Sequence, residues 1–297
     1  MFRLSHLLTS VHPVGTPTGY VELKRCDLSK GGCGTLAIGQ CMSNETLTSE
    51  VVRYLTKHFV TLSQLSEASG IGSSTIMELV RYRCIPSCSY RLSTSTVINS
   101  QVFGDTTIEE ASVELYFSPS VTVWIRRAMK LLEHLSLELA SLHIKNDFKD
   151  AYLKALLESR ARELPTYGFL RLEQDDSRIC EQELEEVWDA WAKGTYGVCT
   201  QNPETAERIA RKNVVVALLE QLTNNGEKKV YSHIEAKAVA AAIREYDSIA
   251  MPFSPHDRAL SSRQRLVDNV LPYIEATERA HSLNQELTLD LTSGCTF

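Results

Sequence analysis

Helical periodicity is the feature that most constrains the fold of this chain. From Thr46 to about Ala280, apolar residues recur at the three- and four-residue spacing of an amphipathic helix, and capping or breaking residues interrupt the pattern at intervals. The alternation of strands and helices that builds a parallel sheet is absent from the pattern. The sequence therefore predicts an all-α protein with a small helix-turn-helix-like N-terminal module followed by a helical bundle.

The same pattern divides the chain into segments. The first 45 residues contain TPTG and GGCG without sustained periodicity, so they are expected to be a poorly structured extension. Because Met42 opens the segment that leads into periodic sequence, one hypothesis is that the native chain starts there. The segments are then 1–45 (extension), 46–92 (helix-turn-helix-like module), 93–117 (irregular or short-strand connector), 118–283 (bundle of about six helices) and 284–297 (loose tail).

The helix-turn-helix-like module follows from local capping signals. Thr61 and Gln64 have the spacing of a capping box, Gly70 supplies a turn, and Ser73 is expected to cap a third helix that ends near Arg83. DNA recognition would need hydrogen-bond donors early in that third helix. The helix instead begins with Ser, Ser and Thr, so a packing role is favoured over DNA binding.

Six further helices are expected in the bundle. Ser118-Pro119 predicts a helix start, and the apolar stripe, which includes Leu139 and Leu142, continues to His143. The other expected helices run from Asp147 to Pro165, from Ser177 or Arg178 past Trp191, from Asn202 to Thr223, from Ser232 to Ile249, and from Ser261 or Ser262 to about Ala280 with a bend at Pro272.

Composition excludes several classes of protein. The net charge of −6 and pI near 5.8 argue against a broad phosphate-binding surface. The eight cysteines form no C-x-x-C pair, and nucleotide-loop and zinc-peptidase motifs are missing, so no metal and no cofactor is expected. Because neither a secretory signal nor an 18-residue apolar window is visible in the sequence, a cytoplasmic protein with reduced thiols is expected.

Several short blocks resemble a bacterial family of natural-product biosynthesis proteins. They are the Leu55-to-Tyr90 block ending in IPSCSY, FSPSVTVWI at 117–125, GTYGVCT at 194–200 with Lys212 downstream, and YDSIAMPFSPHDRALSSR at 246–263. Together they cover roughly residues 46–275 and leave out the first 45. The resemblance implies a place in secondary metabolism, but it implies neither a particular reaction nor particular catalytic residues.

The stretch from Tyr246 to Arg265 is the richest in chemically active side chains. A helix starting at Ser261-Ser262 would present unpaired backbone N–H groups, with Arg258, Arg263 and Arg265 within two turns. Such a set suits sulfate, phosphate or carboxylate. The alternative is that serine caps the helix and the arginines pair with nearby acids.

Acid–base groups lie in the same stretch. His256 is a natural proton carrier near neutrality, and Tyr246 and Asp247 end the preceding helix. A carboxylate at a helix C-terminus opposes the dipole, so Asp247 is expected to have a partner arginine or a ligand amine. In the alternative, Asp257 caps a turn and His256 is exposed.

The GTYGVCT segment adds further candidates. Tyr196 and Cys199 lie between two predicted helices, and Lys212 lies within the second. Tyr196 and Lys212 are assigned here to substrate binding. A structural role for the Cys199 thiol is favoured over a nucleophilic one, because no known nucleophile motif surrounds it. For Lys212 the alternative is a solvated basic stripe with Arg208 and Arg211.

These observations favour an enzyme of secondary metabolism that carries out acid–base chemistry, an elimination or an intramolecular cyclisation, on a small anionic intermediate. In this hypothesis the arginines hold a leaving sulfate or phosphate while Asp247 or His256 removes a proton. Two alternatives stay open: a helix-turn-helix regulator of the pathway, and a scaffold for a partner enzyme or carrier protein that uses the acidic face at 181–189. Nucleic acid and membrane are not expected partners.

Overall fold

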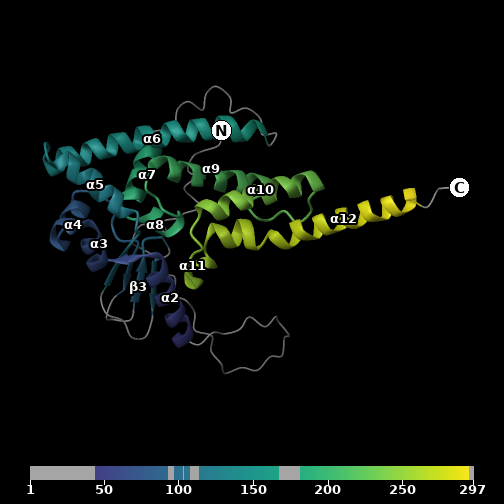
Figure 1. Cartoon of the computed structure of the whole chain (residues 1–297), viewed down its shortest axis with the longest axis horizontal. Helices are drawn as coiled ribbons and strands as arrows, with labels where there is room; N and C mark the ends of the chain where they lie inside the picture. Colours follow the sequence, from purple (N-terminus) through teal and green to yellow (C-terminus); the bar gives the residue numbers. More distant parts are fainter. Residues whose placement is uncertain (1–43, 93–96, 103, 108–113, 167–180, 294–297) are drawn as a thin grey trace.

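The computed structural model describes residues 44–92, 97–102, 104–107, 114–166 and 181–293. The predicted N-terminal extension, apart from its last two residues, and the expected helix start at Ser177 or Arg178 lie outside these ranges. The fold is largely α, as predicted, with one small antiparallel sheet (Figure 1).

The helices follow the order that the sequence predicts. The N-terminal part holds α2 (Asn44–His58), α3 (Leu62–Ser69) and α4 (Ser73–Arg81). The later part holds α5 (Val121–Leu132), α6 (Leu137–Thr166), α7 (Glu181–Ala192), α8 (Thr195–Cys199), α9 (Ala206–Leu222), α10 (His233–Ile249), α11 (Pro255–Arg258), the short π-helix η3 (Gln264–Asp268) and α12 (Leu271–Ser293).

The connector forms strands, which is one of the two structures that the sequence allowed for it. The strands are β1 (Val60–Thr61), β2 (Tyr90–Leu92), β3 (Val97–Ser100), β4 (Gly104–Thr107) and β5 (Glu114–Phe117). They lie in the order β1-β5-β2-β3-β4, and every neighbouring pair is antiparallel. Because β5 pairs with β1, the connector lies beside the helix-turn-helix-like module.

The local signals of the module are confirmed, with one correction. Thr61 and Gln64 form a reciprocal capping box at the start of α3, and Gly70 ends this helix with φ of 70°. Ser73 does not cap α4: the capping position is Gly72, and Ser73 is already helical. The helix ends at Arg81, just before Arg83 adopts a φ of 56°.

The helix predicted from Ser118 to His143 is two helices, and this prediction was wrong. The chain turns between α5 and α6, where Ser136 accepts a hydrogen bond from the backbone N–H of Leu139 at 3.4 Å. Helix α6 then continues through Asp147 to Thr166 without the predicted break. Because the turn changes which face is buried, Leu139 and Leu142 are about half exposed (54% and 53%) rather than inward.

Two other helix ends differ from the prediction. Helix α9 begins after Thr205, whose hydroxyl accepts from the Arg208 N–H at 3.3 Å, so Asn202 and Pro203 precede the cap. The helix predicted from Ser261 or Ser262 is divided: the chain is helical from Ser262 through the π-helix η3, and α12 begins at Leu271 with Pro272 in its first turn, where a missing N–H costs nothing. Helix α12 extends through residues 284–293 of the predicted loose tail and projects away from the other helices (Figure 1).

One continuous apolar core joins the module to the bundle. Leu65 of α3 and Ile76 of α4 belong to the same buried cluster as Trp124 of α5 and Trp191 of α7. The rings of Trp188 and Trp191 stack at 4.5 Å, in the range where aromatic pairs add about 0.5–1.5 kcal/mol beyond area burial. The module therefore packs against the bundle through its apolar face.

Two smaller cores complete the packing. Helices α9, α10 and α12 bury one of them. The other lies between α2, β2, β5 and Met251, which follows α10. This last core brings the N-terminal helix against the segment that leads into α11. No helix within the described ranges is long and apolar enough to cross a membrane.

Candidate functional site

Helix α11 lies at the centre of the stretch that the sequence analysis singled out. Ser254 caps it, with its hydroxyl accepting from the Asp257 N–H at 3.1 Å, and Pro255 occupies the first helical position. Just before the cap, Phe253 is buried with a φ of 61°. A bulky residue in this region costs about 1–3 kcal/mol, and such strain is concentrated at functional sites in proteins.

Asp257 is the most unusual group in this region. The residue is only 1% exposed, and its Oδ2 accepts a hydrogen bond of 2.6 Å from the Tyr90 hydroxyl. Its Oδ1 has no hydrogen-bond partner within the described residues. A buried carboxyl with one unsatisfied oxygen is costly unless it is protonated or receives a ligand.

The electrostatic environment shifts the Asp257 carboxyl toward its protonated form. Burial is the main cause, and it raises the pKa even though the hydrogen bond from Tyr90, the nearby Ser254 hydroxyl and His256 lower it. Burial, followed by the charge of Asp257, also raises the pKa of the Tyr90 and Tyr54 hydroxyls. The Tyr54 and Tyr90 rings meet edge to face at 6.5 Å. The result is a proton-holding cluster in apolar surroundings.

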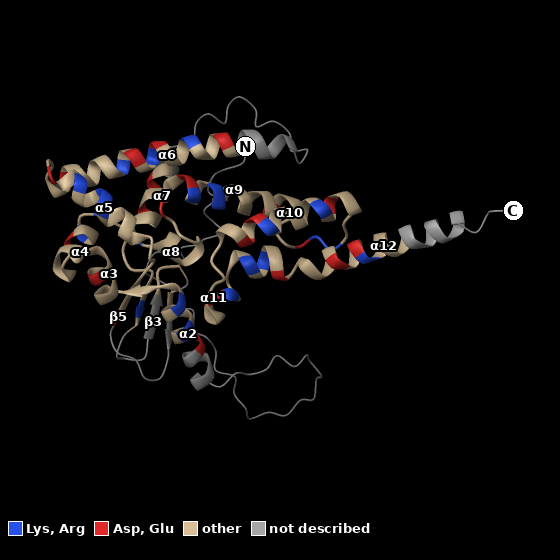
Figure 2. Cartoon of the chain, viewed as in Figure 1, with Lys and Arg blue, Asp and Glu red and all other residues tan. Residues whose placement is uncertain are grey.

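The two arginines predicted to bind an anion are paired with carboxylates. Arg258 donates two hydrogen bonds of 2.9 Å to the two oxygens of Asp268. Arg263 pairs with Asp247 and lies 3.7 Å from Asp268. Figure 2 shows these charges of both signs together where α11 meets the segment leading into α12. An anion at either guanidinium would have to compete with the carboxylate that is already paired to it.

The other predicted groups of this stretch serve the fold. Ser261 donates to the Arg258 carbonyl at 2.7 Å and accepts from the Gln264 N–H at 3.3 Å, so it caps the helical turn as the alternative expected. Tyr246 and Ser262 are both buried, and their hydroxyls are 2.9 Å apart. Asp247 has the partner arginine that its position at a helix C-terminus suggested. Arg265 pairs with Glu220 at 2.8 Å.

Lys212 is buried, so the alternative interpretation, in which it belongs to a solvated basic stripe, is wrong. The residue has 0% exposure in the middle of α9, and its Nζ has no hydrogen-bond partner within the described ranges. The next residue, Asn213, donates to the Tyr152 hydroxyl of α6 at 2.9 Å. A buried ammonium without a partner is expensive, and such lysines often serve a ligand or a reaction.

Tyr196 and Cys199 lie in the buried turn α8. Burial and then the neighbouring Tyr152 raise the pKa of Tyr196 well above its ordinary value. The Cys199 residue is 2% exposed, and its sulfur is 3.8 Å from the Thr200 hydroxyl oxygen. This environment agrees with the structural role that was favoured for the thiol.

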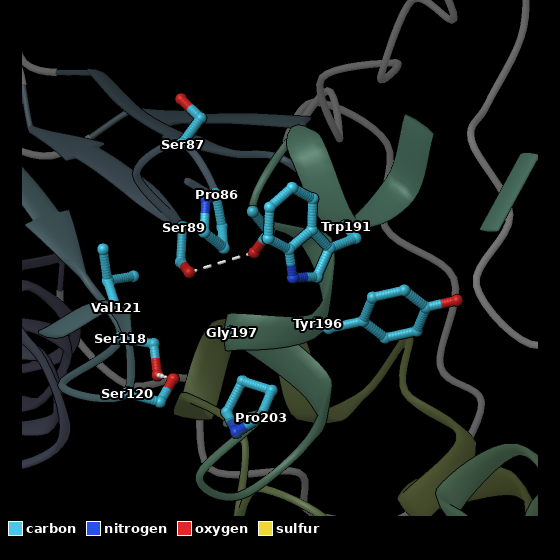
Figure 3. Close-up of a pocket in the computed structure, with 11 residues that line it drawn as sticks. Pro86, Ser87, Ser89, Ser118, Ser120, Val121, Trp191, Tyr196, Gly197 and Pro203 are labelled. Atoms are coloured by element: carbon cyan, nitrogen blue, oxygen red, sulfur yellow. Dashed lines mark hydrogen bonds between the residues drawn. The ribbon is translucent and has the colours of Figure 1, made fainter. Parts of the chain in front are cut away.

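A small cavity beside α8 is lined by serine side chains and Trp191 (Figure 3). Ser89 donates to the Gly194 carbonyl at 3.0 Å, and the Ser118 and Ser120 hydroxyls are 2.8 Å apart. Gly194 has a φ of 80°, and a Cβ there would lie 2.5 Å from the Ser87 carbonyl. The cavity measures about 10 Å³. This is about the space of one water, roughly 10–15 Å³, so a metabolite does not fit.

Three of the acidic residues on α7 are paired with cations. Lys149 of α6 pairs with Glu181 and Glu185, and Lys145 pairs with Glu185 at 2.7 Å. Asp189 accepts from Arg83 at 2.8 Å. These pairs tie α7 to α6 and to the segment after α4, which reduces the charge available to an outside partner.

Sequence reasoning missed three members of the site. Tyr54 and Tyr90 carry no local signal, since Tyr90 and Asp257 are 167 residues apart. Asp268 follows Arg258 by ten residues, which is no helical spacing. For Asp257 the Ser254-Pro255 cap pointed to a turn, but nothing local pointed to its burial.

The geometry thus describes a largely α protein with a buried tyrosine–carboxyl cluster and a buried lysine. The model of a family of unknown function (DUF6058) matches residues 144–274, from α6 to the start of α12. This segment contains Lys212, Asp257 and both arginines but neither Tyr54 nor Tyr90. Comparisons with curated proteins and with solved structures give no significant match. Among the described residues, no three His, Cys, Asp or Glu side chains are placed together to hold a metal ion.

Proposed function

We propose that the protein is an enzyme of secondary metabolism that moves a proton on a small anionic intermediate, in an elimination or an intramolecular cyclisation. In this proposal Asp257 is the proton-transfer group, with Tyr90 holding its carboxyl. His256, one of the earlier candidates, precedes Asp257 on α11, whereas the other two, Tyr246 and Asp247, are paired with Ser262 and Arg263. The resemblance to natural-product biosynthesis proteins supplies the metabolic context.

The single observation that carries the proposal is the Asp257 carboxyl. It is buried, it holds one strong hydrogen bond, and its second oxygen has no partner within the described chain. Proteins prepare general acids and bases in this way, because burial moves a carboxyl pKa toward the pH of the reaction. A carboxyl needed only to tie α11 to β2 would be expected to have both oxygens satisfied.

The anionic part of the substrate is assigned to Lys212 more readily than to the arginines. A substrate anion would give the buried ammonium the partner it otherwise lacks. Arg258 and Arg263 contribute only if the anion competes with Asp268 or Asp247. A sulfate or phosphate leaving group therefore remains part of the proposal. Its binding at the arginines is weakened by competition with the carboxylates of Asp268 and Asp247.

The alternatives receive less support. The exposed side of α4 presents Met77, Glu78 and Arg81, and the last two pair with each other at 3.6 Å, which leaves few donors for DNA. The acidic face considered for a scaffold is engaged by lysines of α6.

The test is complementation of a deletion strain of the native host. We expect the deletion to accumulate a precursor, and wild-type protein and Asp150→Asn, an exposed carboxylate on α6, to restore the product. Asp257→Asn should lower product formation by about 100-fold or more, as for loss of a general acid or base. Circular dichroism verifies that each variant is folded.

Full complementation by Asp257→Asn would overturn the assignment of Asp257. Absence of any metabolite change in the deletion strain, together with altered transcription of neighbouring genes, would favour the regulator.

A further inference from the structure

A groove between α5 and α6 gathers cationic and histidine side chains far from α11 in the sequence. It measures about 540 Å³ and is lined by Arg127, Lys130, Leu131, His134, Leu135 and His143. The volume is in the range of small-molecule sites, about 300–1,000 Å³. The turn that joins the two helices supplies His134 and Leu135, which is the same turn that sequence reasoning did not foresee.

The charges of this groove are only partly compensated. Asp147 accepts from Arg127 at 2.7 Å and lies 3.0 Å from the ring of His143, which fixes both side chains. Lys130 and His134 make no side-chain hydrogen bond or ion pair with any residue that the structure describes. With Arg127 balanced by Asp147, the groove keeps at least the one positive charge of Lys130. An anion therefore finds available donors here.

The helix dipoles do not decide the sign of this site. Helix α5 ends at the groove with partial negative charge, and α6 begins there with partial positive charge. The two partial charges are of similar size and largely offset each other. The side chains consequently determine that the groove attracts anions.

Apolar surface lies beside these donors. Leu131 and Leu135 form part of the lining, and Leu139 is 54% exposed one turn before His143 on the same face of α6. Leu142 is also about half exposed on this helix. Exposed leucines next to a groove add affinity for a ligand that carries hydrocarbon as well as charge.

We propose that this groove binds a small amphiphilic anion, a phosphate or carboxylate attached to a short hydrocarbon body. Lys130 and His134 contact the charged group, Arg127 and His143 frame it, and the leucines cover the hydrocarbon. This binding site is separate from the proposed site at α11 and does not depend on the chemistry proposed there.

Isothermal titration calorimetry of the full chain with hexyl phosphate tests the proposal, at fixed ionic strength. The wild type should bind hexyl phosphate at least tenfold more tightly than inorganic phosphate, because burying two methylenes suffices for about tenfold. The double variant Lys130→Gln/His134→Gln should weaken hexyl phosphate binding roughly tenfold through the loss of charge-assisted hydrogen bonds. Lys154→Gln, an exposed lysine of α6 outside the groove, is the matched control and should bind like the wild type.

Three outcomes would overturn the proposal. Equal affinities of the double variant and the Lys154→Gln control would mean that the groove is not the site. Equal affinities for inorganic and hexyl phosphate would remove the hydrocarbon contact. Sedimentation with phosphatidic acid vesicles, without binding of free hexyl phosphate, would assign the groove to a lipid surface and not to a small molecule.

Discussion

The segment around α11 and the groove between α5 and α6 both collect cationic side chains, yet they offer them differently. At α11, Arg258 and Arg263 are held by Asp268 and Asp247. In the groove, Lys130 has no carboxylate partner within the described residues. A cluster of arginines in a sequence therefore does not by itself locate an anion site, because the fold decides where the carboxylates lie.

The physical reason is that binding is a difference of free energies. An anion at α11 gains a guanidinium but competes there with a carboxylate that makes the same kind of hydrogen bond. An anion in the groove displaces only water and counterions.

Removing the carboxylate of Asp268, which lies beside both Arg258 and Arg263, should have the largest effect on stability. We expect Asp268→Ala to lower the free energy of unfolding by about 2 kcal/mol, since two charge-assisted hydrogen bonds are lost at a partly exposed site. Urea denaturation measures the change. Asp150→Ala, on an exposed face of α6, is the control. If both variants lose less than about 0.5 kcal/mol of unfolding free energy, the prediction is contradicted.

Freeing the arginines should also create an anion site. Asp268→Asn is expected to gain a saturable, sulfate-dependent rise in Tm that exceeds the rise in the wild type. Chloride at matched ionic strength controls for screening, and non-saturating, equal rises in both proteins would indicate only exclusion of sulfate from the surface. Loss of the extra rise in Asp268→Asn/Arg258→Ala would place the anion on Arg258.

Lys212 provides the converse case, a cation that is buried without a partner. We expect Lys212→Met to stabilise the fold by about 1–2 kcal/mol, because methionine fills a similar volume without a charge to bury. The same variant should lose function in the complementation assay. Thermal denaturation measures the first effect, and a lower Tm than the wild type would show that the ammonium is stabilised in the native state.

A dependence on pH should distinguish Asp257 from the carboxylates that hold the arginines. Folding raises the Asp257 pKa above its ordinary value of 3.8 through burial. In the pH range between that value and the folded pKa, the native state binds more protons than the unfolded state, so stability falls as pH rises. Asp257→Asn removes this fall.

Urea denaturation of both proteins from about pH 4 to about pH 8 checks the sign, since this range starts near the unperturbed carboxyl pKa. The variant should gain stability relative to the wild type as pH rises and then level off. A difference that stays constant with pH would mean that folding does not shift this carboxyl.

The smallest effect is expected in the groove. Lys130→Gln should change the free energy of unfolding by less than about 0.5 kcal/mol, because the side chain is exposed and makes no ion pair with the described residues. The same measurement as for Asp268→Ala applies. A loss of unfolding free energy as large as that of Asp268→Ala would contradict the contrast between the two regions.

Local sequence signals predicted a largely helical fold and the positions where some of its helices begin. The capping boxes of Thr61 with Gln64 and of Ser232 with Glu235 were predictable because each one joins groups three residues apart. The partner of Asp247 was anticipated for a similar reason, since an acid at a helix C-terminus needs a cation. These rules are local, because the groups that they involve lie close together in the sequence.

Which charged groups are available to a ligand depends on tertiary packing. The burial of Lys212, the hydrogen bond from Tyr90 to Asp257 and the turn at Ser136 depend on how distant helices and strands pack. Burial changes the free energy of a charge far more than its neighbours in sequence do, because it removes the surrounding water. Part of the candidate site, such as Arg258 and Lys212, was therefore visible in the sequence, but Tyr54, Tyr90 and Asp268 joined it only through the fold.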